Sequence, residues 1–203
     1  DIDDLRPEAL LFQTGYLTIK NAEHGIYSLR YPNSEVKSAF LEILLHSLAK
    51  GASGTGISKF ILLSKYLREE DFEAFFETVT AIFSAIPYAL NANRDEAYFH
   101  TLFYLMVSAS GTDAENEILT CRGRIDLVAG FPGSVHIMEF KCNRSAEAAI
   151  KQIRDKGYAE RYMQGRKKIF LIGVNFSMDK RVPAEWKVEI GRASCRERVC
   201  HRV

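Results

Sequence analysis

Two acids and a lysine lie on either side of one short turn in the centre of this 203-residue chain. Asp126 stands in the apolar run that ends at Gly130. Glu139 and Lys141 stand in the run that begins at Val135. Two carboxylates and an ammonium group within reach of one another can hold a divalent cation and orient a water molecule. Their types and spacing therefore raise the hypothesis of a hydrolytic metal site.

The sequence between these residues predicts a β-hairpin. A Pro-Gly turn separates two runs that alternate as strands do. A four-residue loop, 131–134, pairs Gly130 with Val135 and sets Asp126 directly opposite Glu139, whereas a register slipped by one residue does not. Directly opposed side chains on one face have Cβ atoms about 5 Å apart. The two acids then repel each other, and a positive group is expected between them.

Strand alternation returns Lys141 to the face of Glu139. It also places Arg124 on the face of Asp126, so these four residues could form a checkerboard of weak ion pairs on a solvated sheet. Apolar residues on the same face indicate instead that the face is partly covered. The residues of that face are Val128 and Ile137, and the opposite face carries His136, Met138 and Phe140. Spacing alone leaves the metal site and the checkerboard both open.

Length and composition are those of an ordinary globular protein that can bury a full core, with 47% apolar and 26% charged residues. No stretch approaches the roughly 18 consecutive apolar residues of a membrane span. The acidic start does not fit a signal peptide, so a cytoplasmic location without a membrane partner is expected. The four cysteines do not form a disulfide framework or a zinc site.

The last thirteen residues, 191–203, break from the preceding pattern and are expected to be a non-native tail. Their four Arg and one Glu leave 23 of the 27 basic and 25 of the 26 acidic residues in 1–190, a net charge of −2. That charge argues against strong autonomous binding of nucleic acid. A basic stripe could supply local binding or could be a solvated face. It consists of Lys151, Arg154, Lys156, Arg161, Arg166, Lys167 and Lys168.

Residues 1–90 predict a helical region with one hairpin. A helix over 6–14, with Leu10, Leu11 and Phe12 inward, precedes strands at 16–20 and 26–31. A helix over 35–50 follows, and two more are expected at 58–68 and 71–85. The order helix, hairpin, helix suggests a winged-helix-like unit, which either binds nucleic acid or serves as a structural spacer.

Residues 91–190 predict a mixed sheet with helices on both faces. An apolar helix over 94–107 carries Glu96 and His100 on one face. A strand at 116–122 and the central hairpin precede a helix that begins at Ser145 and runs to about Met163, with Gln152 at the edge of its buried stripe. A continuous apolar run at 168–175 is typical of a strand covered on both faces, and a short strand is expected at 186–190.

Taken together, these residues resemble the PD-(D/E)XK nuclease superfamily. The pattern is an acid on a helix, Asp on a strand, Glu-x-Lys on the next strand and Gln on the following helix. The resemblance is closest to the bacterial branch whose members usually follow an AAA-ATPase-like domain, and it covers nearly all of residues 8–190. Its segments are Leu10–Ile19, Gly123–Asp126, Glu139–Lys141, Lys156–Glu160 and Ile172–Phe176.

The resemblance implies a restriction-endonuclease-like core and Mg²⁺-dependent hydrolysis of DNA phosphodiester bonds, with Mn²⁺ as a substitute. Asp126 and Glu139 would hold the metal, with the Phe140 carbonyl and Glu96 as further ligands. Lys141 would orient or help deprotonate the attacking water, and Gln152 would support the site. His100 and Tyr158 are further candidates. The superfamily's proline is absent, because Ile125 precedes Asp126.

No Walker-type nucleotide-binding loop occurs in the sequence, so the chain is expected to belong to a longer protein with an ATPase-like domain upstream. Two functions remain open at this stage. The first is a Mg²⁺-dependent nuclease that acts on DNA. The second is a docking or DNA-binding module without catalytic activity, because a fold does not fix a function. Oligomeric state and strand preference do not follow from the residues.

Overall fold

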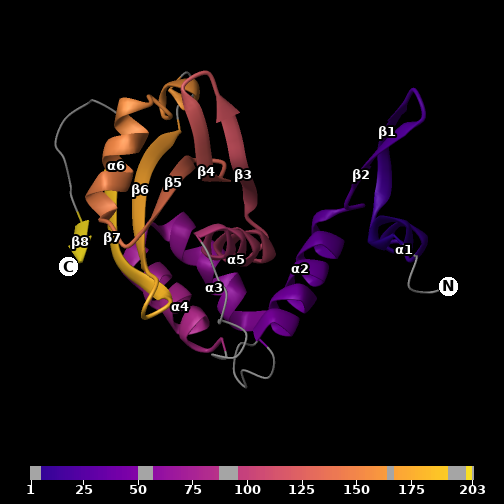
Figure 1. Cartoon of the computed structure of the whole chain (residues 1–203), viewed down its shortest axis with the longest axis horizontal. Coiled ribbons are helices and arrows are strands. Elements are labelled where there is room, and N and C mark those ends of the chain that lie inside the picture. Colours follow the sequence, from indigo (N-terminus) through magenta and orange to yellow (C-terminus); the bar gives the residue numbers. More distant parts are fainter. Residues whose placement is uncertain (1–5, 50–56, 87–95, 164–166, 192–199, 203) are drawn as a thin grey trace.

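A mixed β-sheet covered by helices forms the larger part of the chain, and a helix with a β-hairpin projects from it (Figure 1). The computed structural model describes residues 6–49, 57–86, 96–163, 167–191 and 200–202. The helices are α1 Pro7–Gln13, α2 Ser34–Ala49, α3 Ile57–Glu69, α4 Phe72–Ser84, α5 Glu96–Ala109 and α6 Ala146–Asp155. The strands are β1 Thr18–Glu23, β2 Ile26–Arg30, β3 Asp113–Thr120, β4 Gly123–Gly130, β5 Ser134–Cys142, β6 Lys168–Ser177, β7 Val182–Ile190 and β8 Cys200–Arg202.

The large sheet has the strand order β3-β4-β5-β6-β7-β8. Neighbouring strands are antiparallel except β5 and β6, which are parallel and are connected through α6. The sheet is therefore mixed and flanked by helices, as the sequence predicted. The predicted hairpin register is confirmed from Gly130–Val135 to Leu127–Met138, but the pairing ends there and does not include the predicted pair of Asp126 with Glu139.

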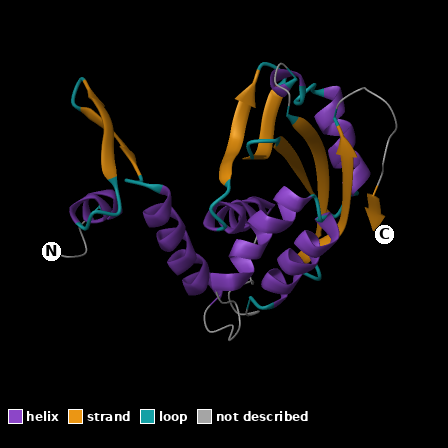
Figure 2. Cartoon of the chain, turned by 180° about the vertical axis from the view of Figure 1, so that it is seen from behind, coloured by secondary structure: helices purple, strands orange, loops and turns teal. Residues whose placement is uncertain are grey.

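Helices cover both faces of the sheet, and each face has its own apolar cluster (Figure 2). Helix α6 covers one face, where Ile150 and Ile153 pack on residues of β4, β5 and β6. Helices α3, α4 and α5 cover the other face with a larger cluster rich in phenylalanine. The predicted double coverage of the 168–175 strand is confirmed, because Phe170 and Ile172 face one cluster and Leu171 faces the other.

Local sequence explains where α4 begins and which face it buries. The Asp71 carboxylate accepts a hydrogen bond of 3.1 Å from the Ala74 amide and caps the helix. Phe72, Phe75 and Phe76 then recur at helical spacing and are all buried. Phe76 stacks on Trp186 of β7 with ring centroids 4.9 Å apart, which fixes α4 against the sheet.

The N-terminal segment has the predicted order of helix, hairpin and helix, but its core is absent. The prediction that Leu10, Leu11 and Phe12 point inward is wrong, because none of residues 6–30 is buried. The turn between β1 and β2 is shorter than predicted, with two residues of positive φ, His24 and Gly25, as in a tight two-residue hairpin. This hairpin projects from the larger part of the chain together with α1, and its residues are all exposed or half-buried (Figure 1).

Helix α6 is shorter than the predicted span of 145 to about 163. It begins as predicted after Ser145, whose side chain accepts a hydrogen bond of 3.1 Å from the Ala148 amide. It ends at Asp155 because Gly157 adopts a positive φ of 61°, the conformation that usually terminates a helix. A 3₁₀ turn at Glu160–Tyr162 follows.

The division at residue 90 and the non-native tail stay predictions. A single apolar cluster joins α3 and α4 to α5 and the sheet, across that proposed division. In the proposed tail, β8 pairs with β7 at Trp186, Lys187 and Val188. Within the described ranges, the helices are all too short or too polar to span a lipid bilayer.

Candidate active site

The hairpin of β4 and β5 brings Asp126, Glu139 and Lys141 together. The Phe140 amide donates a hydrogen bond of 2.9 Å to Asp126 Oδ2. Lys141 Nζ donates to Glu139 Oε1 at 2.8 Å and to the Phe140 carbonyl at 2.9 Å. Lys141 therefore supplies a positive group beside Glu139, and one cluster holds both carboxylates and the ammonium group.

Strand β4 does not keep a regular alternation at Asp126. Residues two apart in a regular strand share a face. Ile125, however, packs in the cluster beneath α6, whereas Leu127 packs in the cluster beneath α3, α4 and α5. The alternation breaks at Asp126, at the point where the pairing of β4 with β5 ends. Its carboxylate binds the β5 backbone directly and also faces the cavity beside α5.

Glu139 is a buried carboxylate with an unusual proton affinity. It is 1% exposed. Burial, followed by the charge of Asp126, raises the pKa of Glu139 to about 7, although hydrogen bonding to Lys141 opposes this shift. Within the described part of the chain, its Oε2 atom is buried and receives no hydrogen bond. A raised pKa and an unsatisfied oxygen are typical of functional sites.

Gln152 on α6 reaches the same carboxylate. Its Nε2 donates a hydrogen bond to Glu139 Oε1, while the supporting role of Gln152 in the site stays a prediction. Helix α6 is held in place at both ends: the Ala146 amide donates to Glu185 Oε2 at 3.0 Å, and Arg154 forms an ion pair with Glu189 of β7. A rigid helix therefore fixes one oxygen of the buried acid.

Gly173 allows α6 to lie this close to the sheet. It is the partner of Glu139 across β5 and β6. A Cβ atom at Gly173 would lie 2.3 Å from the Ala146 carbonyl oxygen, far inside contact distance. Sequence reasoning assigned no role to this residue, although a glycine inside a strand is a known signal of close backbone approach.

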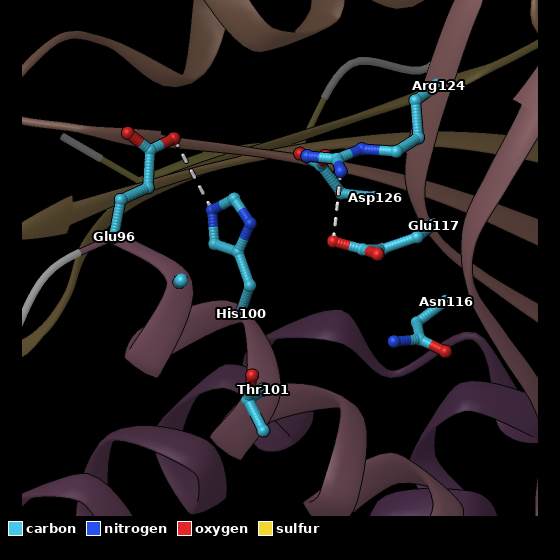
Figure 3. A pocket seen from close by; sticks show the side chains of 8 residues that line it. Glu96, His100, Thr101, Asn116, Glu117, Arg124 and Asp126 are labelled. Carbon is cyan, nitrogen blue, oxygen red and sulfur yellow. Dashed lines mark ion pairs between the residues drawn. The ribbon is translucent and has the colours of Figure 1, made fainter.

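A polar cavity of about 480 Å³ opens beside the carboxylates, between α5, β3 and β4 (Figure 3). It is lined by Glu96, Ala97, His100, Thr101, Asn116, Glu117, Arg124 and Asp126. Two polar contacts lie in its lining: Glu96 Oε1 is 3.5 Å from His100 Nε2 on the same helix, and Glu117 Oε1 of β3 is 3.0 Å from Arg124 Nη1 of β4 in an ion pair. The structure thus brings Glu96 and His100 to the cavity of Asp126, while Asn116, Thr101 and Glu117 carried no signal in the sequence.

His100 is half-buried, and its ring lies 4.9 Å from that of Phe140, centroid to centroid. Burial lowers the pKa of His100, and the charges of Asp126 and Glu96 offset part of that shift. The neutral imidazole is favoured by this environment. His100 therefore occupies the wall of the cavity with its α5 neighbour Glu96 and lies outside the cluster of Glu139.

Tyr158 supports the site from beneath β4. It is 2% exposed, and its hydroxyl donates a hydrogen bond of 2.8 Å to the Arg124 carbonyl. The hydroxyl also interacts with Gln152, and burial raises the pKa of Tyr158. Tyr158 thus connects α6 with the strand that carries Asp126, and does not reach the carboxylates itself.

The donors at this site fit a divalent cation held by two carboxylates. Mg²⁺ binds through one or two carboxylates and keeps several waters. Glu139 interacts with Asp126, and among the described residues its Oε2 has no hydrogen-bond partner, so it is open to a cation. No group of three or more His, Cys, Asp or Glu side chains within the described ranges could hold a metal ion. Glu96 contacts His100, and the Phe140 carbonyl accepts from Lys141, so their roles as ligands stay predictions.

The alternative of a solvated checkerboard does not describe the Glu139 side of the hairpin. The Lys141 side chain is 13% exposed, and its carboxylate partner is almost completely buried. Arg124, by contrast, is half-exposed and pairs with Glu117 of β3. Of the four charged residues, Glu139 and Lys141 form a buried pair, whereas Arg124 pairs with Glu117, which lies outside the predicted set. Asp126 belongs to neither pair.

Residues 94–186 match the family model of the PD-(D/E)XK nuclease superfamily. The chain is also 38% identical, over 203 residues, to an uncharacterized protein in the vnfD 5′ region of Azotobacter chroococcum mcd 1. That alignment covers 93% of this chain and 38% of the relative, so the chain spans well under half of the relative's length. No solved structure matches the chain. The matched residues include the whole candidate site, and the match suggests nuclease activity.

Proposed function

We propose that this chain is a metal-dependent nuclease that hydrolyses DNA phosphodiester bonds with Asp126, Glu139 and Lys141. The observation that carries the proposal is the buried Glu139, whose pKa is raised to about 7 beside a second carboxylate. An ion pair alone leaves the buried Glu139 Oε2 without a partner among the described residues, whereas a bound cation would supply that partner. The match of residues 94–186 to a nuclease family supports the same reading.

Asp126 and Glu139 would hold Mg²⁺, or Mn²⁺ in its place, and Glu96 and the Phe140 carbonyl would complete the shell. Bound there, the ion would polarise the phosphoryl group and lower the pKa of a coordinated water. The Phe140 amide holds Asp126 Oδ2, and Gln152 holds Glu139 Oε1, so the two carboxylates are oriented before substrate arrives. Pre-oriented ligands avoid reorganisation during the reaction.

Lys141 orients the attacking water and offsets the charge that develops on the phosphate. Its ammonium group is held by Glu139 Oε1 and by the carbonyl of the preceding residue, within the same cluster as both acids. In a partly buried site, an ammonium group interacts with a developing negative charge more strongly than it would in water. His100 contributes to the wall of the cavity that would receive the strand.

The test is cleavage of plasmid and single-stranded DNA during titration with Mg²⁺ and Mn²⁺. We expect metal-dependent cleavage by the wild type. We expect the rate to fall at least about 100-fold in Asp126→Asn, Glu139→Gln and Lys141→Ala. Matched controls are Asp155→Asn and Lys151→Ala, which remove an exposed ion pair on α6. These controls should cleave at the wild-type rate.

Cleavage that survives in Asp126→Asn and Lys141→Ala would remove the active-site assignment. An absence of cleavage by the wild type with either metal would favour the second candidate function, a docking module. Thermal unfolding of each variant separates loss of chemistry from loss of fold.

The N-terminal segment favours that second role. Helix α1 and strands β1 and β2 line an apolar groove of about 410 Å³. Its lining residues are Glu8, Ala9, Phe12, Ile19, Tyr27 and Leu29. Because the curated relative is much longer than this chain, we propose that the groove docks an ATPase-like domain of the longer polypeptide. Phe12→Glu and Tyr27→Glu should weaken binding of that domain supplied in trans, and unchanged affinity would contradict the role.

A further inference from the structure

Arg124 lines the cavity of Asp126 but has no part in the cleavage chemistry above. Its Nη1 atom lies 3.0 Å from Glu117 Oε1, and the two side chains are 52% and 61% exposed. Ion pairs this exposed contribute little to stability because water solvates both groups well. Arg124 can therefore leave Glu117 for a partner that binds it more strongly.

The backbone of Arg124 is fixed while its side chain is not. The Tyr158 hydroxyl donates to the Arg124 carbonyl at 2.8 Å from the side of the sheet that α6 covers. On the cavity side, the Arg124 side chain extends toward Glu117 (Figure 3). A fixed backbone with an exposed guanidinium is the arrangement of a binding residue, since only the side chain has to move.

Glu117 adopts a conformation that glutamate rarely takes. Its φ of 52° is left-handed, and the residues on either side of it pair regularly with β4. The departure is therefore confined to one residue, at the position across from Asp126. Strained residues of this kind gather at ligand sites, and here the strain places a carboxylate beside Arg124.

The cavity is short of positive charge. Of the eight described residues that line it, three are acids and Arg124 is the one with a permanent positive charge. A nucleic acid strand that enters must find a cation for its phosphates. The planar guanidinium can donate to two phosphate oxygens at once. A carboxylate and a phosphate accept from the same donors, so a guanidinium that pairs with a carboxylate can also bind a phosphate.

We propose that Arg124 binds a backbone phosphate of the nucleic acid substrate, and that Glu117 occupies its guanidinium until that phosphate arrives. The exchange makes and breaks ion pairs only, with no covalent step. This inference rests on the proposed nuclease function, because it names the residue that receives the strand at the same site. Arg124 is a substrate-binding residue, and Glu117 is its competitor.

The test measures binding of a short fluorescein-labelled DNA, single-stranded and duplex, in a chelator so that cleavage does not interfere. Arg124→Gln should weaken binding about tenfold and reduce the salt slope of the affinity by about 1. Glu117→Gln should strengthen binding about threefold, because the guanidinium loses its competitor. The DNA affinity of Arg124→Lys should lie between those of wild type and Arg124→Gln, since lysine keeps the positive charge but lacks the two parallel donors of the guanidinium.

The double variant distinguishes exchange from a general charge effect. In Arg124→Gln, the further change Glu117→Gln should have no effect, because there is no guanidinium to release. The neighbouring pair of Arg122 and Glu160 is a matched control, at 2.8 Å and with side chains 53% and 60% exposed, but outside the cavity lining. Arg122→Gln and Glu160→Gln should change the affinity less than twofold.

Three results would overturn the inference: equal strengthening by Glu117→Gln in both backgrounds, equal weakening by Arg122→Gln and Arg124→Gln, or no binding of either DNA by the wild type at low salt. These readouts do not depend on cleavage. A wild type that cleaves while Arg124→Gln binds normally would overturn this inference alone. A wild type that binds through Arg124 but never cleaves would overturn the nuclease chemistry alone.

Discussion

Compared with the sheet and its covering helices, the segment from α1 to β2 buries none of its side chains, although both regions are rich in apolar residues. In the sheet body, the first seven residues of β5 are all buried. A two-stranded hairpin without a covering layer is marginally stable by itself. The body has a hydrophobic core of its own, whereas the N-terminal segment leaves its apolar side chains largely exposed.

The largest difference between the two regions should appear when one phenylalanine in each is replaced and the loss of stability is compared. Phe75 of α4 is completely buried, and Phe12 of α1 is 44% exposed. We expect Phe75→Ala to lower the free energy of unfolding by about 3 to 5 kcal/mol, because a cavity replaces the ring. Phe12→Ala should change it by less than about 0.5 kcal/mol. Urea unfolding followed by circular dichroism measures both, and equal losses would contradict the comparison.

A glycine substitution tests how closely α6 packs on the sheet. Gly173→Ala should lower the free energy of unfolding by about 3 kcal/mol, because the new methyl group meets the Ala146 carbonyl. It should also slow DNA cleavage, since Gln152 would move from Glu139. The control is Gly133→Ala in the hairpin turn, where nothing lies within 4 Å of the added atom. If both variants unfold alike, the close approach of α6 is wrong.

Lowering the pH should reduce the free energy of unfolding of the body through the buried His136. This ring is buried, stacked on Phe170 at 4.9 Å, and burial lowers the pKa of His136 to about 4. Its ordinary pKa is 6.5, so the unfolded chain takes up the proton first as the pH falls. The stabilisation of the folded state by neutral His136 is complete above about pH 6.5 and is lost as the pH falls toward 4. The free energy of unfolding should therefore fall by about 2 kcal/mol between pH 7 and pH 5.

The measurement is the free energy of unfolding of wild type and His136→Leu across that pH range. Subtracting one curve from the other removes the titration of the shared carboxylates. A flat difference would show that His136 does not titrate in the folded interior as expected.

Removing the N-terminal segment should have the smallest effect. Deletion of residues 1–31 should change the free energy of unfolding of the body by less than about 1 kcal/mol, because none of residues 6–30 is buried and Tyr16 meets α2 through a ring contact with Phe40. Extending the deletion through α2 should destabilise the body clearly more, since Leu41 is buried in its core. Similar unfolding curves for the two deletions would contradict this boundary.

Much of the local structure was predictable because it depends on neighbouring residues. The Pro-Gly turn set the register of β4 and β5, and Asp71 and Ser145 marked the starts of α4 and α6. The end of α6 was missed although Gly157 signalled it. The inward face predicted for α1 was wrong because an apolar stripe indicates which face can be buried, and cannot show that a partner layer exists.

The candidate site divides in the same way. The types and order of Glu96, Asp126, Glu139, Lys141 and Gln152 were available from the sequence, and the structure brings all of them to the cluster or its adjoining cavity. Strand parity could not predict the break at Asp126 or the left-handed Glu117, because both depend on where β4 stops pairing with β5 and on a single unpaired position within the β3–β4 ladder.

By itself, the sequence determined the chemical groups of the site and the hairpin that carries them, because side-chain types and two-residue alternation are local properties. Only the tertiary structure decided that Glu139 is buried, that Gly173 lets Gln152 reach it, and that Arg124 pairs with Glu117 in the lining of the cavity. Proton affinity and ion pairing depend on distance and on the exclusion of water. Those quantities are fixed by contacts between residues far apart in the chain.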